Sequence, residues 1–261
     1  MRTNGWTRRH LLQSTAVAVA ASPLAVFAES LLAGRPAPAE SVLPTGSFVY
    51  ATLASPSPSR SSALLVLQKQ QADWRQVQQL EAESPRAAVF DASKQFLYVA
   101  HVAARKQGLP SGRVGVYRVD RATGHLHPHA QQRLALSAKR PLALGLAPTG
   151  DLLVVAAEGG VFSVLPVLPQ GQLQPVSAAY KHLQFASNEP EAVSLQFSPR
   201  GALAVQARGA MHAFRCAADG LTPVESVTLE SNIPAAVGPV GVPELPDLHC
   251  LAILSQGKPL F

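Results

Sequence analysis

Three histidines alternate along the segment His125-Leu-His127-Pro-His129, directly after a Thr123-Gly124 turn. Side chains two residues apart on a strand share one face, so an extended segment would align the three imidazoles. Two or three imidazoles on one face can hold zinc or copper. The alternative is protection of an outer strand, because titrating side chains and proline keep such a strand from pairing with other chains. We favour the second interpretation and expect no bound metal.

Other motifs that could support chemistry are few. Gly159-Gly160 is not followed by a helical pattern, so we interpret it as a tight turn between strands and not as a phosphate loop. No serine lies in a G-x-S-x-G pattern. Cys216 and Cys250 are the two cysteines, and we expect separate buried thiols, because a disulfide requires Cα atoms within about 7 Å. With no ligand set for haem, iron–sulfur or molybdenum, we expect no cofactor.

The elements that must position reactive residues come from a repeat. It occurs at Ala87–His101, Leu142–Ala157 and Ala192–Ala207, each time as an apolar strand, a polar turn and a second apolar strand. The turns align as Asp91–Lys94, Pro148–Asp151 and Pro199–Ala202. A further strand, a glycine-containing turn and a last strand with an early proline follow each copy. Four strands about every 50 residues predict an all-β propeller of four to five four-stranded blades, without helices.

The two ends of the repeat array are less regular. The first unit, from Phe48 to Leu80, begins on what would be the second strand of a blade. A last blade usually completes the first one, and Ala236–Val242 is the segment that we expect to pair with the Phe48 strand. Leu248–Ser255 then has no obvious place. A ring that remained open would expose an apolar edge and self-associate through it.

The first residues resemble an export signal. Thr7-Arg8-Arg9 is a twin-arginine pattern, and an apolar run from Thr15 to Phe27 ends in a small-residue cleavage site at Ala28. The run is too short for a membrane span. We therefore expect a signal peptide at 1–28, a proline-rich linker at 29–47, a propeller domain at 48–261, and a periplasmic or exported location.

Charge argues against a nucleic-acid partner. The chain has 22 lysines and arginines and 16 acidic residues, a net charge of +6. Removal of Arg2, Arg8 and Arg9 with the signal leaves 19 minus 16, or +3. This weak excess is not gathered in a basic cluster, so nucleic-acid binding is not indicated.

The repeat resembles the lactonase family of β-propellers, which includes bacterial 6-phosphogluconolactonases. The resemblance rests on the repeat copies, on VGVYRVDRATGHLHP (114–128) and on EGGVFSVLPVLPQGQLQPV (158–176), and it covers roughly residues 48–230. It implies a metal-free hydrolase that opens a sugar lactone at a polar central funnel. Family members are usually seven-bladed, so this chain is about two to three blades short.

The family's site histidines are mostly absent. The family's Gly-Pro-His-x-His-Ser stretch corresponds here to Glu189–Ser194, so Glu191 and Val193 replace both histidines, and Ala143 replaces a third. Ester hydrolysis needs a base and a donor for the oxyanion. The candidates that remain are Glu191 and His101 as catalytic residues, with Arg105, Glu158 and Arg208 as substrate-binding residues; Glu189 lies nearby. Alternatively, these residues are ordinary charged residues on solvent-exposed loops, without a role in catalysis or binding.

Two functions remain open. One is a lactonase-type hydrolase with a sugar-lactone substrate. The other is a non-catalytic periplasmic propeller that binds a protein or glycan partner. A polar, histidine-bearing funnel would favour the enzyme, whereas an apolar funnel lined by Ala143, Ala157 and Val193 would favour the binding protein.

Overall fold

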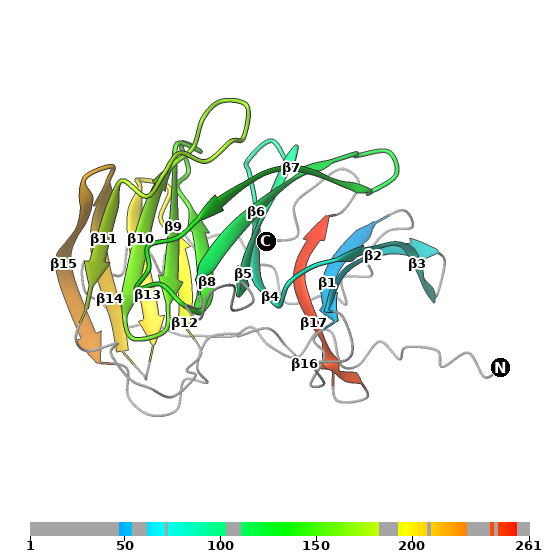
Figure 1. Cartoon of the computed structure of the whole chain (residues 1–261). Helices are drawn as coiled ribbons and strands as arrows, with labels where there is room; N and C mark the ends of the chain where they lie inside the picture. The colour runs from blue at the N-terminus through cyan, green and yellow to red at the C-terminus, as the bar shows by residue number, and fades with distance from the viewer. Residues whose placement is uncertain are drawn as a thin grey trace.

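The computed structural model is all-β (Figure 1). It describes residues 47–53, 62–70, 73–102, 111–182, 193–207, 210–228, 241–242 and 245–254. Seventeen strands form four antiparallel sheets, and these described ranges contain no helix. Hence none of them offers a helix that could cross a membrane.

Each sheet is one blade of a propeller, named here I to IV in chain order. From the innermost strand outward, blade I contains β17 (Leu245–Leu254), β1 (Phe48–Leu53), β2 (Ala63–Gln70) and β3 (Asp73–Glu81), and the short β16 (Gly241–Val242) extends it beside β17. Blade II contains β4 (Pro85–Phe90), β5 (Phe96–Val102), β6 (Gly112–Val119) and β7 (Leu126–Arg133).

The other two blades repeat this order. Blade III contains β8 (Pro141–Leu146), β9 (Leu152–Ala157), β10 (Val161–Pro166) and β11 (Ala178–Lys181). Blade IV contains β12 (Val193–Phe197), β13 (Ala202–Ala207), β14 (Ala210–Ala217) and β15 (Gly220–Thr228). Four blades agree with the number predicted from the repeat.

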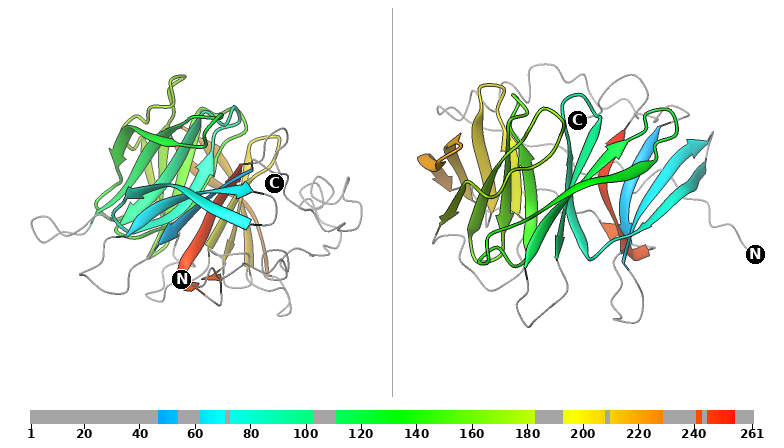
Figure 2. Two further views of the ribbon diagram at one scale, coloured as in Figure 1. Left: turned by 90° about the vertical axis from the view of Figure 1, so that its right-hand side faces the viewer. Right: turned by 45° about the horizontal axis from the view of Figure 1, so that its top comes forward.

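The blades stand side by side in an arc. The innermost strands pack in the order β17, β4, β8 and β12. Figure 1 and the right-hand view of Figure 2 show blade I and blade IV at opposite ends of this arc. The fold is therefore an incomplete propeller.

The strand that completes blade I is not the predicted one. β17, drawn in red in Figure 1, pairs antiparallel with β1, so that Phe48 lies opposite Leu254 and Leu53 opposite Leu248. The expectation that Ala236–Val242 pairs with the Phe48 strand was wrong. Within that segment only Gly241–Val242 is described as a strand, and it pairs with β17. Pro239 and the glycines around it make a poor inner strand, because proline cannot donate to the ladder.

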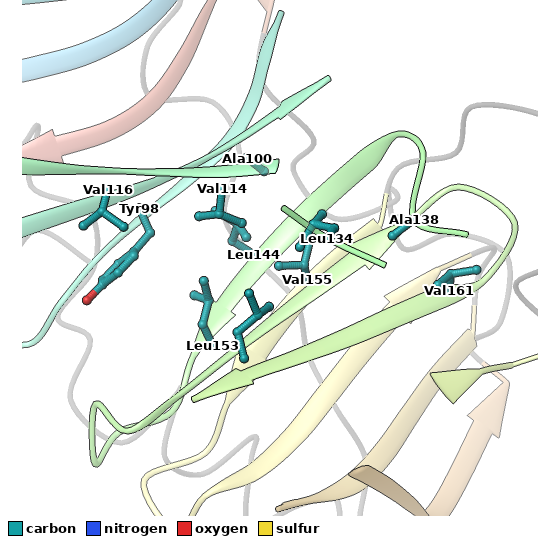
Figure 3. Close-up of a cluster of buried hydrophobic side chains, with 12 residues drawn as sticks. Tyr98, Ala100, Val114, Val116, Leu134, Ala138, Leu144, Leu153, Val155 and Val161 are labelled. Atoms are coloured by element: carbon teal, nitrogen blue, oxygen red, sulfur yellow. The ribbon is translucent and has the colours of Figure 1, made fainter. Parts of the chain in front are cut away.

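Three apolar cores join neighbouring blades. The core between blades II and III is built from alternate residues such as Tyr98, Val114, Leu153 and Val155, all nearly fully buried (Figure 3). Equivalent cores lie between blades I and II and between blades III and IV. Because strand side chains alternate between faces, the apolar positions on both faces of each central blade supply these cores.

An aromatic side chain from one blade packs on a glycine of the next. An added Cβ at Gly124 would lie 2.3 Å from Cδ1 of Phe48, and one at Gly171 would lie 2.6 Å from Cγ of Phe96. Both aromatic residues begin the second strand of their blade. The hydroxyl of Tyr50 also donates a hydrogen bond of 2.8 Å to the carbonyl of Gly124. These contacts fix how neighbouring blades are aligned.

The turns of the repeat align one residue away from the predicted alignment. The backbone N–H of Lys94, Gly150 and Gly201 donates to the carbonyl three residues earlier, and all three have positive φ. These three residues are therefore equivalent. Glycine is favoured at such a position because a Cβ raises its energy.

Candidate functional site

The strands have two structurally different ends. We call one the turn end; among the described residues it includes turns 91–95, 120–125, 147–151, 167–177, 198–201 and 218–219. We call the opposite end the loop end; among the described residues it includes 82–84, 134–140, 158–160 and 182. Of the candidate site residues from the sequence, the two that the structure describes, His101 and Glu158, lie next to or in a connection at the loop end.

Aspartates at the turn end serve the turns themselves. The Asp91 carboxylate accepts the Phe96 N–H at 2.7 Å. The Asp120 carboxylate accepts the Ala122 N–H at 2.9 Å and the Thr123 hydroxyl at 2.8 Å. These bonds, with that of Thr123 the strongest, lower the pKa of Asp120. Such local bonds stabilise turns, so we place the candidate site at the loop end.

At the loop end, the inner strands β4 and β8 each start with proline and a bulge. The register shifts between Pro85 and Ala87 in β4 and between Pro141 and Ala143 in β8. The extra residue is Arg86, which is exposed, in blade II and Leu142 in blade III. A bulge at such a position redirects the side chain of the extra residue.

Arg86 was missed in the sequence analysis. The signal was the recurring Pro-x-Ala triplet, which aligns Arg86 and Leu142 with Glu191. The position after the proline is therefore the variable one, carrying a cation, an apolar side chain and an acid in successive blades. Glu191 itself lies outside the described residues.

Glu158 lies beside the start of β8. Its carboxylate is 3.4 Å from the Arg140 guanidinium, and its N–H donates to the Arg140 carbonyl at 2.8 Å. Gly159 and Gly160, both with positive φ, form the predicted tight turn directly after it. The pair is partly exposed, so it can meet a ligand at the inner part of the loop end.

His101 lies inside blade II and not on an open funnel wall. Its side chain is 1% exposed. Nδ1 lies 3.1 Å from the Glu83 carbonyl, and Nε2 lies 3.3 Å from the Tyr117 hydroxyl. Because a carbonyl only accepts, Nδ1 carries the proton and Nε2 accepts from the tyrosine. Burial, with a smaller contribution from the Arg113 cation, lowers the pKa of His101 from 6.5 to about 4.

A second ion pair covers His101. The Arg113 guanidinium lies 3.2 Å from the Glu83 carboxylate, and both side chains are partly exposed. Burial also raises the pKa of Tyr117. His101 and Tyr117 are therefore both neutral near pH 7 beneath this charged pair.

The structure describes two of the five predicted site residues, His101 and Glu158. Arg105, Glu191 and Arg208 lie outside the described residues, as does Glu189. The predicted apolar funnel wall does not exist in the expected form. Ala143 and Val193 pack in the core between blades III and IV, and Ala157 packs between blades II and III. These three residues therefore cannot distinguish an enzyme from a binding protein.

The histidines of the alternating string lie at the start of the outermost strand of blade II. His125 precedes β7, and His127 lies opposite Arg118, which in turn lies opposite Phe96. The His129 ring packs on Phe96, at 5.2 Å between ring centroids, with Nε2 3.0 Å from the Gln170 carbonyl of blade III. His127 and His129 therefore lie on the face directed toward blade III, although the ladder shifts register between Val116 and Tyr117. β7 is the outermost strand, as predicted.

The part of the chain that the structure describes contains no group of three His, Cys, Asp or Glu side chains able to hold a metal ion. Cys216 is a free thiol on β14, and burial raises its pKa to about 11. Cys250 is on β17, so the cysteines belong to different blades, as expected.

A ring cluster at the loop end joins blades III and IV. His182 follows β11, and its ring lies 5.1 Å from that of His212 on β14 and 5.7 Å from that of Phe214. Burial lowers the pKa of both histidines, and for His212 the neighbouring His182 adds to the effect. The cluster involves third and outermost strands, away from the inner strands.

Comparisons with known proteins agree with this architecture. The family model described as Lactonase, 7-bladed beta-propeller, matches residues 49–233. No curated protein matches the chain in sequence.

Solved propellers are similar in fold. A candidate 6-phosphogluconolactonase from Bacteroides fragilis superposes with a TM-score of 0.54 at 18% identity, over 74% of this chain and 56% of that one. One from Bacteroides uniformis gives 0.53 at 17% identity, over 74% and 57%. The periplasmic gluconolactonase PpgL of Pseudomonas aeruginosa gives 0.52 at 18% identity, over 82% and 70%. The chain thus spans just over half the length of the two Bacteroides proteins.

Proposed function

Because the chain belongs to the lactonase family of seven-bladed β-propellers, we propose that it is a lactonase-type hydrolase that opens sugar lactones at the loop end. The observation that carries this proposal is the family match over residues 49–233. Its support from geometry is the gathering of charged residues at the loop end, while the aspartates of the turn end are used in turns. The neighbours named gluconolactonases make a sugar lactone the substrate class to test first.

The reaction divides into two tasks. Water adds to the lactone carbonyl carbon, the bond to the ring oxygen breaks, and the product is a hydroxy acid. A base must take the proton of the water, and cations or N–H donors must stabilise the oxyanion. We assign the base to Glu191, which aligns with the bulged position of β4 and β8. Arg86 and Arg140, at the starts of β4 and β8, are the cations for the oxyanion, and Glu158 orients Arg140.

For His101 the burial supports a positioning role. Both ring nitrogens have partners inside blade II, so a substrate atom reaches neither while this packing is kept. The ring holds the Glu83 carbonyl and the Tyr117 hydroxyl in place at the loop end. The predicted catalytic role of His101 would need this site to open.

The test is hydrolysis of 6-phosphogluconolactone and gluconolactone by residues 29–261, measured against the spontaneous rate. We expect turnover above background for the wild type. Replacement Glu191→Gln should lower kcat on the order of 100-fold, because the amide cannot take the proton. Glu81→Gln, on the outermost strand β3, is the matched control and should retain full activity. A wild-type rate equal to the spontaneous rate on both lactones would exclude the lactonase proposal.

The second candidate function is a non-catalytic periplasmic propeller that binds a glycan or protein. One observation favours it: the bulged positions at the starts of β4 and β8 carry Arg86 and Leu142, neither of which can act as a general base near pH 7. Binding of lactones or sugar acids without turnover would support this alternative over the enzyme.

We also propose export through the twin-arginine signal, with a signal at 1–28, a linker at 29–47 and a propeller at 48–261. The support is the Arg8-Arg9 pair and the Ala28 cleavage site. Mass spectrometry of protein from a periplasmic extract should find an N-terminus at Glu29. Replacement of both arginines by lysine should retain the precursor in the cytoplasm, and export of this variant at the wild-type level would contradict the proposal.

A further inference from the structure

We propose that Arg113 and Arg133, on the outer half of blade II, form a binding site for the carboxylate of a small sugar acid. Arg113 on β6 lies directly opposite Arg133 on β7 in a regular part of the ladder. Residues directly opposite in an antiparallel pair share a face, with Cβ atoms about 5 Å apart. Two arginine side chains therefore project from one face of blade II at the loop end.

The shared face is the one directed toward blade I. Val114 and Val116, the alternate residues of β6, pack in the core between blades II and III. Tyr117, on the same side of β6 as Arg113, packs instead in the core between blades I and II. The site is thus separate from the inner-strand starts assigned to lactone opening.

The two cations are only partly compensated. Glu83 pairs with Arg113 at 3.2 Å, with 28% of the arginine side chain and 42% of the glutamate side chain exposed. Arg133 is exposed, and no ion pair to it occurs among the described residues. Like charges directly opposite each other destabilise a sheet, so a bound anion would relieve this pair. Two guanidiniums and one carboxylate leave one net positive charge, which matches a monoanion.

Among the described residues, Glu83 is the acid that pairs with this arginine pair. Beneath the pair, the His101 ring and the Tyr117 hydroxyl are hydrogen-bonded to each other. On β3 of blade I, Val77 and Leu80 pack in the core between blades I and II, and Gln78 bonds to Leu126. The charged residues Asp73 and Arg75 lie at the far end of that strand. An external anion therefore competes with Glu83 for Arg113.

The ligand class follows from this charge and from guanidinium geometry. A planar guanidinium binds the two oxygens of a carboxylate through parallel N–H donors, and the second guanidinium supplies further donors. That the carboxylate belongs to a sugar acid rests on the proposed function, since lactone opening produces one. The site would then bind product or a related acidic sugar outside the reaction centre.

The test is binding of sodium gluconate to residues 29–261 at low ionic strength, followed by saturation-transfer NMR. Sodium galacturonate is the second probe and separates an open-chain aldonate from a uronate ring. We expect at least one of them to bind, and neutral glucitol not to bind. Arg133→Gln should weaken binding about tenfold, the loss expected for one charge-assisted pair. Arg113→Gln should do the same but also removes the ion pair with Glu83.

The matched control is Arg118→Gln, an exposed arginine at the turn end of the same strand. It should leave the gluconate affinity unchanged. Equal weakening by Arg118→Gln and Arg133→Gln, binding of neither acid, or tighter binding of inorganic phosphate than of both acids would overturn the proposal. Lactone turnover is measured separately on the wild type, so gluconate binding without turnover would contradict the proposed function and leave this site standing.

Discussion

Replacement of Gly124 by alanine should lower the free energy of unfolding by about 3–4 kcal/mol. The φ of Gly124 is +72°, where a Cβ costs roughly 1–2 kcal/mol. The new Cβ would also lie 2.3 Å from the Phe48 ring. That ring is fully buried between blades I and II and cannot move away without disturbing the core. Overpacking of this kind typically costs a further 1–3 kcal/mol, or about 2 kcal/mol here.

Gly150→Ala is the matched control for this prediction. Its φ is +76°, but an added Cβ would meet nothing within 4 Å. It should therefore lose only about 1–2 kcal/mol, from backbone strain alone. Urea denaturation of both variants and the wild type measures the difference, which isolates the contact between blades. Equal losses of unfolding free energy in the two variants would show that the Phe48 ring moves aside and that its contact with Gly124 does not align the blades.

Acid should destabilise the fold strongly through His101. Its pKa is about 4 in the folded protein and 6.5 when unfolded. Between these values the unfolded chain binds more protons, so stability falls as the pH falls. The contribution is complete above about pH 6.5 and is lost as the pH approaches 4. From pH 7.5 to pH 4, His101 alone should remove roughly 3 kcal/mol of the free energy of unfolding.

The measurement is the unfolding free energy of the wild type and of His101→Gln across this pH range. The variant is expected to be less stable at pH 7.5, because it alters the bonds to Glu83 and Tyr117, but to show a shallower pH dependence. His182 and His212 act in the same direction in both proteins, so the difference between the curves reports His101. A His101→Gln curve parallel to the wild type would refute the prediction.

The sequence predicted the blades because their strands carry strong local signals. Apolar alternation with a turn residue at Lys94, Gly150 or Gly201 marks each hairpin, and it recurs three times. The closing strand carries no such signal. Its partner is β1, some 200 residues away, so no local turn specifies the pairing. From its position in the repeat, Ala236–Val242 was predicted to be the closing strand. Pro239 in that segment cannot donate a backbone hydrogen bond, and β17 pairs with β1 instead.

The site was harder to predict, because the register of each strand decides on which face of the sheet a given side chain lies. One-residue shifts make Arg86 the extra residue of β4, Leu142 that of β8 and His129 that of β7. Alternation alone gives none of these orientations. The burial of His101 was hidden for a related reason. It depends on Tyr117 from the next strand and on Gly115, where a Cβ would come within 2.9 Å of Nε2.

The pairing of β17 with β1 has a consequence for synthesis on the ribosome. Phe48 and Leu254 are separated by 206 positions, 254 minus 48, so β1 leaves the ribosome long before its inner partner. Until then blade I has an unpaired inner edge, next to a blade II that can already fold by local contacts. Pairing over such a distance is slow to form. The nascent chain therefore passes through a long interval in which the inner edge of β1 can pair with strands of other chains, and this interval ends when β17 emerges and pairs with β1.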